Sequence, residues 1–294
     1  MKYKLSITLF VFLLFLTSNS NYVNAQPLSS NKPPIIGIFG DIHGNQDVME
    51  KVLIQMKERG VTHIIGTGDF ISNKRGVTHG NTGNLIIVEG AEMLEEMISQ
   101  ITPITGVPKD KIFLCPGNWE HETVDFPEQM NEKLKKYGNL IFEKHDGYGF
   151  VEIENEKIMV SHFPQHPIPE EFLPPPRFRQ KISSRVTSVM ETVEKGIYPP
   201  MDVSFEIFAH NHIAGSFVDK KTGKLVVNAG VLDNVAKSPT EPRGYAIYEA
   251  QKGEIHFIDF EKRKTITSVN VIGKKKPNAT RDCLRFLLMS TLAH

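Results

Sequence analysis

Aspartate, asparagine and histidine side chains that could bind metal ions recur along this sequence, in short motifs that each begin where an apolar run ends. The motifs are Gly40-Asp41-Ile42-His43-Gly44-Asn45, Gly68-Asp69, Gly117-Asn118-Trp119-Glu120, Ser161-His162, Ala209-His210-Asn211-His212 and Asn228-Ala229-Gly230. Two Asp, one Asn and four His among them are the ligand types that suit a pair of divalent ions able to activate water. The motifs therefore predict a two-metal site.

The apolar runs before these motifs predict the strands that position them. The runs are Ile35 to Phe39, His63 to Thr67, Lys111 to Cys115, Lys157 to Val160 and Val203 to Phe208. A buried strand followed at once by a polar ligand is typical of the carboxyl edge of an open α/β sheet. After the first run, Asn45 can cap a helix from about Gln46 to Arg59, which Gly60 would end. With the next strand over Val61 to Thr67, this β-loop-α-β order predicts a parallel sheet.

The rest of the chain is expected to add further helices and a second sheet. The expected elements are a long polar loop from Ile71 to Asn84, a helix from Leu85 to Gln100, a connection from Thr102 to Asp110, a helix from Phe126 to Tyr137 and a hairpin from Phe150 to Val160. Prolines bound the stretch 165–200, and within it Phe178 to Lys195 has the spacing of an amphipathic helix. A packed surface helix is the favoured interpretation, and a substrate cap or membrane-facing element is the alternative. From Lys224 onward the chain is strand-rich, which predicts a second sheet packed on the first.

The order and content of the motifs resemble those of the calcineurin-like metallophosphoesterase family, from about Pro34 to the Gly244-Tyr245 region. The resemblance implies an α/β fold in which two packed mixed β-sheets are flanked by helices, a four-layer α/β/β/α sandwich. It also implies the ligand sets, which are Asp41, His43 and His212 for the first metal, Asn118, His162 and His210 for the second, and Asp69 as the bridge between both. Such mixed ligands suit Mn, Fe, Zn or Co rather than Ca²⁺, and the sequence does not choose among these metals.

The resemblance further implies hydrolysis of a phosphoric ester by a hydroxide that bridges the two metals, without a covalent intermediate or an organic cofactor. The residues expected to be catalytic are Asp69 and Asn118, together with His121 if its loop redirects it toward the site.

The third motif departs from the family pattern. Many members have His or Asp directly after the Asn, and there a His serves as the acid for the leaving group, whereas this chain has Trp119. Relatives with Cys or Arg at this place look like phosphodiesterases or pyrophosphatases. Loss of a positioned acid typically lowers the catalytic rate by about 10²–10⁴-fold, which predicts slow hydrolysis of phosphomonoesters. Trp119 could instead stack on an aromatic part of the substrate, or simply pack at the rim of the site.

Basic and imidazole side chains outside the ligand set are candidate substrate contacts. His79 and Arg75 stand on the long polar loop, where solvated side chains are the alternative interpretation. Arg243 follows the Asn228-Ala229-Gly230 turn and is a candidate phosphate contact.

These features predict an exported, metal-dependent phosphoric ester hydrolase that acts on a phosphodiester or pyrophosphate-type bond in a small or lipid-linked molecule. One alternative is a phosphomonoesterase or nucleotidase in which His121 or a loop residue supplies the acid. Another is a catalytically silent metal-binding protein that uses the same cleft to bind a ligand or partner. Metal content does not separate these alternatives, but turnover does.

The N-terminal residues have the features of a signal peptide. Lys2 and Lys4 precede the apolar run Leu5 to Leu16, and Val23-Asn24-Ala25 fits a cleavage site. The run is shorter than the roughly 20 residues that span a bilayer, so we expect cleavage after Ala25, a secreted or periplasmic protein and no stable membrane span. A linker over 26–33, a metallophosphoesterase domain over 34–272 and a tail over 273–294 would follow.

Composition limits the other function classes. The formal net charge is +0, from 34 basic and 34 acidic residues, and no basic block stands out except Lys274-Lys275-Lys276, which argues against a broad basic footprint for nucleic acid. The chain has only two cysteines, Cys115 and Cys283, and two free thiols are expected rather than a disulfide.

Overall fold

The computed structural model describes most of the expected domain and little beyond it. The described residues are 22–24, 33–72, 77–78, 85–86, 90–123, 127–143, 147–165, 202–220, 222–232 and 243–271. Residues 26–32 of the expected linker, the helix 178–195, the C-terminal tail, Arg75 and His79 lie outside these residues. None of the helices in the described ranges has the length and hydropathy of a membrane-spanning segment.

A seven-stranded mixed sheet carries three of the expected strands at its centre. Its order is β15-β14-β13-β2-β3-β6-β7. The strands are β2 (Ile35–Phe39), β3 (His63–Gly66), β6 (Ile112–Leu114), β7 (Asn139–Leu140), β13 (Gly244–Glu249), β14 (Glu254–Asp259) and β15 (Lys264–Asn270). β2, β3, β6 and β7 are parallel, whereas β13 pairs antiparallel with both β2 and β14. The parallel strands therefore end at the same edge, where the first three motifs begin.

A six-stranded mixed sheet carries the remaining motifs. Its order is β1-β8-β9-β10-β12-β11. The strands are β1 (Tyr22–Asn24), β8 (Tyr148–Ile153), β9 (Glu156–Ser161), β10 (Phe205–Phe208), β11 (Gly215–Val218) and β12 (Leu225–Asn228). β8 and β9 form the expected hairpin, and β9, β10 and β12 are parallel. Of the strands after Lys224, only β12 joins this sheet, because β13 pairs with the open side of β2 and continues the first sheet.

The helices begin and end close to the expected residues, with three differences. They are α2 (Gln46–Glu58), α3 (Gly90–Ser99), α4 (Ile101–Thr105), the 3₁₀ turn η1 (Lys109–Lys111), α5 (Asn118–Thr123) and α6 (Pro127–Tyr137). The helix expected from Leu85 begins at Gly90 instead, because Leu85–Ile86 forms strand β5, which pairs with β4 (Val77–Thr78). The connection expected after Thr102 contains most of α4, which ends at Gly106 with φ 75°. α5 was not expected, because its residues are those of a candidate site motif.

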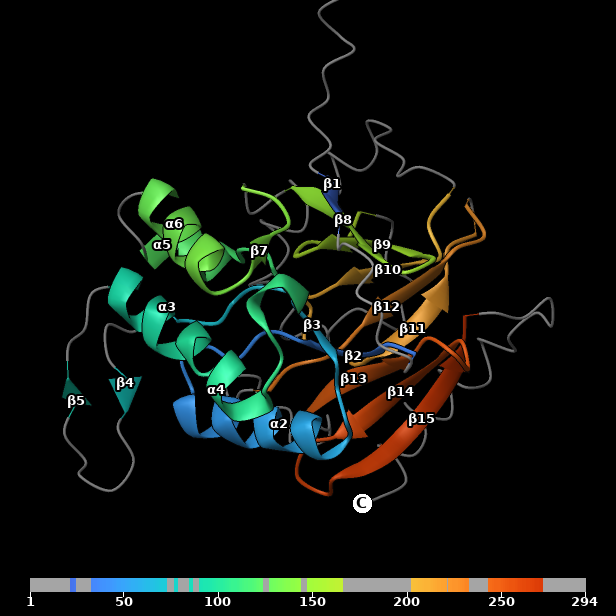
Figure 1. Ribbon diagram of the computed structural model, residues 1–294, viewed down its shortest axis with the longest axis horizontal. Coiled ribbons are helices and arrows are strands. Elements are labelled where there is room, and N and C mark those ends of the chain that lie inside the picture. The colour runs from blue at the N-terminus through green and yellow to red at the C-terminus, as the bar shows by residue number, and fades with distance from the viewer. Residues whose placement is uncertain are drawn as a thin grey trace, which may run out of the picture.

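Two large clusters of buried apolar side chains lie between the layers of the fold. One consists of apolar side chains between the two sheets, among them Ile38, Phe113 and Ile207. The other lies between the seven-stranded sheet and the helices, and includes Met49 and Leu53 of α2. Figure 1 shows the described helices grouped on the side of the seven-stranded sheet that faces away from the six-stranded sheet. Two packed mixed sheets with helices are thus confirmed. The amphipathic helix expected over 178–195 lies outside the described residues.

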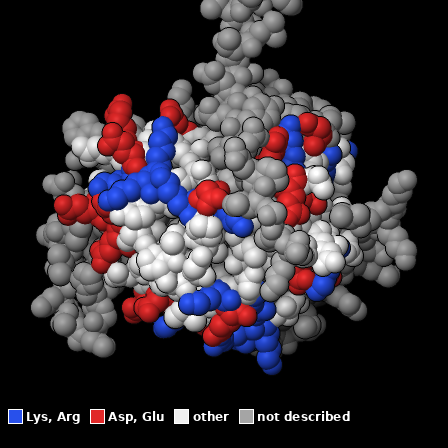
Figure 2. All heavy atoms as spheres, viewed as in Figure 1, with Lys and Arg blue, Asp and Glu red and all other residues white. Residues whose placement is uncertain are grey.

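Charged side chains of both signs are interspersed on the surface. Figure 2 shows the described Lys and Arg side chains lying beside Asp and Glu side chains on this face. Glu95 of α3, for example, pairs with Lys133 and Lys136 of α6. On the part of this face that the structure describes, no large area of one sign stands out.

Candidate metal centre

The loops after β2 and β3 are joined by a short backbone ladder that fixes the first two motifs. The Asp41 amide donates to the Gly68 carbonyl at 3.0 Å, and the His43 amide donates to the Asp69 carbonyl at 3.0 Å. The next amide, that of Gly44, donates to the Phe70 carbonyl at 2.8 Å. Asp41, His43 and Asp69 are therefore held side by side at the carboxyl edge of the sheet, as the strand order predicts.

Several candidate ligands have left-handed backbone conformations, which non-glycine residues rarely adopt. Asp41, His43, Asp69, His210 and His212 have φ values of 50°, 53°, 53°, 70° and 64°. Such conformations cost on the order of 1–3 kcal/mol each and persist only where the surroundings impose them. Backbone strain is thus concentrated at the candidate site.

Two glycines allow the loops after β3 and β6 to approach each other. A Cβ atom on Gly68 would lie 2.4 Å from the Gly117 nitrogen, and one on Gly117 would lie 2.1 Å from Oδ1 of Asp69. Gly68 also has φ 90°, which favours glycine. Any side chain at either position would push Asp69 and Asn118 apart.

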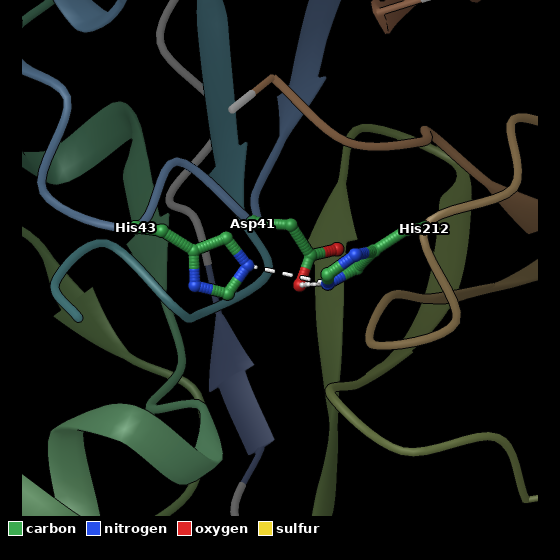
Figure 3. A group of neighbouring side chains, drawn as sticks. All are labelled: Asp41, His43 and His212. Atoms are coloured by element: carbon green, nitrogen blue, oxygen red, sulfur yellow. Dashed lines mark hydrogen bonds and ion pairs between the residues drawn. The ribbon is translucent and has the colours of Figure 1, made fainter. Parts of the chain in front are cut away.

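Asp41, His43 and His212 form one group of potential ligands. One ligand atom from each lies within 4.8 Å of the other two. Nε2 of His43 and Nε2 of His212 are 3.2 Å apart, and Nε2 of His212 is 3.5 Å from Oδ1 of Asp41. Figure 3 shows the three side chains pointing toward one another from the loop after β2 and from the loop between β10 and β11.

Asp69, His162 and His210 form the second group, also within 4.8 Å of one another. Asn118 belongs with them, because its Oδ1 lies 3.2 Å from Nε2 of His162 and 3.0 Å from Nδ1 of His210. Nδ1 of His162 contacts the carbonyl of Thr67 at 2.8 Å, which directs Nε2 toward the group. The structure thus brings together all seven residues expected as ligands, in the expected division, and their binding of ions stays a prediction.

The chemistry of these groups fits divalent cations. Imidazole nitrogens and carboxylate or amide oxygens converge there, and Nε2 of His43 faces Nε2 of His212 at 3.2 Å. Among the described residues, the buried Oδ1 of Asp41 has no hydrogen bond of normal geometry, and Nε2 of His212 lies 3.5 Å from it as an ion pair. A buried carboxylate oxygen without a donor is costly unless a cation compensates it.

Charge within the cluster is shaped by burial and by the neighbouring groups. Burial alone would raise the pKa of Asp69, but His162 and His43 hold it well below its usual range. Burial would likewise lower the pKa of His162, yet Asp69 raises it to about 9. For His210, burial and the adjacent His162 together lower the pKa to about 3. The cluster therefore combines anionic oxygens with a neutral imidazole, a mixed set that borderline metals accept.

Glu120 was missed by the sequence analysis, although its motif was recognised. Its side chain is 0% exposed and accepts hydrogen bonds from the backbone amides of Asp69, Ile71 and Gly117 at 2.8, 3.0 and 2.6 Å. Burial and then the charge of Asp69 raise the pKa of Glu120 to about 7. The available signal was a carboxylate three residues after Gly117, the spacing of a capping box at a helix start.

Asn228 has a similar structural role beneath the two histidines of the fifth motif. Its side chain is fully buried, donates from Nδ2 to the Ala209 carbonyl at 3.1 Å and to Oδ1 of Asn211, and accepts from the Gly230 amide at 2.7 Å. These bonds hold the loop that carries His210 and His212 against the end of β12.

The other candidates occupy varied positions. Trp119 is half-buried beside the helix-side core, and its ring meets His43 edge to face with centroids 6.3 Å apart. His121 lies one turn after Asn118 in α5. The Arg243 guanidinium pairs with Glu261, donates to the Leu232 carbonyl and stacks on Phe260. The expected roles of Trp119, His121 and Arg243 stay predictions.

Comparisons with known proteins agree with this geometry. The model of the calcineurin-like phosphoesterase superfamily domain matches residues 35–253, a range that includes every motif described above. No curated protein matches the chain significantly.

Several solved structures are similar to this chain at low identity. The phosphoesterase Yfce from E. coli is 15% identical with a TM-score of 0.46, over 81% of this chain and 100% of that one. An archaeal phosphodiesterase is 16% identical with a TM-score of 0.39, over 80% and 98% of the two chains. A metallophosphoesterase from Sphaerobacter thermophilus is 15% identical with a TM-score of 0.42, over 77% and 87%.

Proposed function

This chain belongs to the calcineurin-like phosphoesterase superfamily, and from that premise we propose that it is a phosphoric ester hydrolase that works with two divalent transition-metal ions. The observation that supports the proposal best is the pair of ligand groups, Asp41 with His43 and His212, and Asp69 with His162 and His210. Each group gathers its ligand atoms within 4.8 Å at the carboxyl ends of the strands. Open α/β sheets bind their ligands at this edge.

The residues have distinct tasks in the proposed reaction. Asp41, His43 and His212 would hold one ion, and Asn118, His162 and His210 would hold the other. Two such ions supply an activated water and neutralise charge on the phosphoryl oxygens. Asp69 would serve both ions, as the resemblance to the family implies, and its Oδ2 lies 3.4 Å from Nε2 of His162.

Trp119 supports a preference for diesters or pyrophosphates over monoesters. Its backbone amide donates to Oδ1 of Asp69 at 2.9 Å, and its ring lies against His43, so the residue adjoins both ligand groups. An indole cannot release a proton to an alkoxide leaving group as an imidazolium can. Substrates with good leaving groups depend least on such an acid.

Export and a small or lipid-linked substrate complete the proposal. The sequence supports export through its basic start, its short apolar run and the small residues around Ala25. The balanced charge supports a substrate other than nucleic acid.

The test compares Mn²⁺-dependent hydrolysis of bis-p-nitrophenyl phosphate with that of p-nitrophenyl phosphate, using protein from residue 26 onward. Asp69→Asn serves as the control, because it removes a charge from both ligand groups. We expect diester turnover that requires Mn²⁺ and disappears in Asp69→Asn.

Two other outcomes would change the assignment. Faster turnover of the monoester would favour the phosphomonoesterase, with His121 as the acid to test next. A folded protein that binds two Mn²⁺ ions and hydrolyses neither compound, nor dinucleotide pyrophosphates, would favour the silent metal-binding protein.

A further inference from the structure

Glu120 joins two loops that carry candidate ligands through hydrogen bonds of its carboxylate. Its Oε2 accepts from the amides of Asp69 and Gly117, and its Oε1 accepts from the amide of Ile71. Asp69 and Ile71 follow β3, whereas Gly117 and Glu120 follow β6. The carboxylate is 0% exposed, so these bonds are made without competition from solvent.

Each of the two loops also accepts a hydrogen bond from the backbone of the other. While Glu120 accepts from the backbone of Asp69, Oδ1 of Asp69 accepts from the backbone of Trp119 at 2.9 Å. Each acid therefore anchors the loop of the other. Asn118 lies between Gly117 and Trp119, so both of its neighbours are held. The left-handed φ of Asp69, 53°, is imposed where these bonds meet.

Only a carboxylate of this length satisfies the three amides. A Gln side chain has one acceptor oxygen, so its amide nitrogen would face an N–H donor of Asp69, Gly117 or Ile71. An Asp side chain is one methylene shorter and would not reach both loops at the same distances.

From this arrangement we propose that Glu120 is a positioning residue that fixes Asp69 and Asn118 relative to each other, so that both ion sites form together. The inference rests on the proposed two-ion centre. Glu120 itself contacts backbone amides and acts through the residues that bind the ions. Partners that orient metal ligands typically change metal affinity by about 10–100-fold when they are removed.

Glu120→Gln tests the proposal, with Glu122→Gln as the matched control. Glu122 lies on the same short helix but is exposed, so the control makes the same change of charge away from the loops. Mn²⁺ binding to metal-free protein is measured by titration calorimetry, and the ion pair by electron paramagnetic resonance. We expect Glu120→Gln to bind Mn²⁺ about 10–100-fold more weakly and to lose the spin-coupled signal, while Glu122→Gln matches the parent.

Kinetics supply a second readout. At saturating Mn²⁺, Glu120→Gln should lower kcat for the diester and leave KM within about two-fold, since substrate still meets the same ions. Parental Mn²⁺ affinity and kcat in folded Glu120→Gln would overturn the proposal. Because the calorimetry needs no substrate, a parent protein that binds Mn²⁺ but hydrolyses nothing would overturn the proposed function alone.

Hydrogen exchange of the parent covers the case in which Glu120→Gln fails to fold. If Glu120 fixes the loops in advance, the amides of Asp69, Ile71 and Gly117 are protected before any Mn²⁺ is added. Rapid exchange at these amides in the metal-free parent, followed by protection with Mn²⁺, would show that the ions and not Glu120 order the loops.

Discussion

At the scale of single residues, Trp119 is the position at which the proposed preference among esters can be tested. It follows Asn118 in α5, contacts His43 through its ring and contributes its amide to Asp69. Its side chain packs partly on the helix-side core, so the indole has a structural role as well. A change at this position therefore alters chemistry and packing together, and two variants are needed to separate them.

Trp119→His should raise hydrolysis of monoesters by about 10-fold or more, because an imidazole can protonate the leaving group. The gain should be larger for phenyl phosphate than for p-nitrophenyl phosphate, whose leaving group needs a proton least. Trp119→Phe keeps an aromatic ring without an acid, and its monoester rate should stay at the parental level. Equal rates for Trp119→His and Trp119→Phe on both esters would show that a missing acid is not the limitation.

His63 gives a pH dependence of stability that is separate from the metal centre. It begins β3, and its Nδ1 contacts the hydroxyl of Thr62 at 2.9 Å. Burial and then the charge of Lys111 lower the pKa of His63 from 6.5 to about 4, whereas Asp110 has a weaker, opposite effect. Between pH 6.5 and about 4 the unfolded chain therefore binds a proton that the folded chain does not. Stability from this group is complete above pH 6.5 and is lost as the pH falls toward 4.

The expected loss from His63 is about 2–3 kcal/mol between these pH values. Urea denaturation of the parent and of His63→Gln at several pH values measures it, because the variant lacks the titrating group. The difference in unfolding free energy between the two proteins should change with pH across this window. A pH-independent difference would contradict the assignment.

The candidate ligands could be predicted from single residues, but the residues that support them could not. Asp41 and His162 were recognised because metal-binding side chains after buried strands have a distinctive pattern. Glu120 binds no ion in the proposed site. Its spacing from Gly117 could indicate a helix cap, but its bonds to the amides of Asp69 and Ile71 have no sequence signature. Its importance depends on the loops after β3 and β6 lying side by side, which is a property of the folded sheet.

At the scale of elements, the loop between β10 and β11 is held by hydrogen bonds from β12 as well as by its own. Asn228, the last residue of β12, bonds to the Ala209 carbonyl and to Asn211, and its Oδ1 accepts from Gly230. His210 and His212 belong to different ligand groups, so a shift of this loop would disturb both.

Asn228→Ala should lower the unfolding free energy by about 2–3 kcal/mol, because it leaves buried polar groups without partners. It should also weaken Mn²⁺ binding, measured by calorimetry on the folded variant. Asn228→Asp keeps the acceptor for Gly230 but directs a carboxylate at the Ala209 carbonyl, and it should be no better than the Ala variant. Parental Mn²⁺ affinity in both variants would exclude a positioning role for Asn228.

Elements with strong local signals were predicted well, and those defined by distant partners were not. Asn45 caps α2 by accepting from the Val48 amide at 3.2 Å, as expected from its place before an apolar stripe. β13 was expected in the second sheet, but its antiparallel pairing with β2 places it in the first. Strand periodicity identifies a strand without identifying its neighbour.

At the scale of the whole molecule, the expected cleavage would remove one strand from the six-stranded sheet. β1 pairs with β8 through Tyr22, Val23 and Asn24 at the end of that sheet. The expected signal peptide ends at Ala25, so the mature chain would lack this strand. Loss of a three-residue edge strand leaves the candidate metal centre untouched, because the ligands follow other strands.

Protein that starts at residue 26 should therefore fold and bind Mn²⁺ with the same affinity as protein that retains residues 22–25. Its free energy of unfolding should differ by about 1 kcal/mol or less, as for a short pairing at a sheet edge. Expression with residues 1–25, followed by N-terminal sequencing of exported protein, locates the cleavage. Intact residues 1–25 on a membrane-bound product would contradict the expected signal peptide.

The place of β13 in the sheet has a consequence for the synthesis of this protein. The strand lies between β2 and β14, although about two hundred residues separate it from β2 in the chain. The seven-stranded sheet therefore cannot be completed until about two hundred residues after β2 have left the ribosome, and pairing between such distant segments is slow. Under the proposed export, this late pairing would keep the chain unfolded for longer before it crosses the membrane.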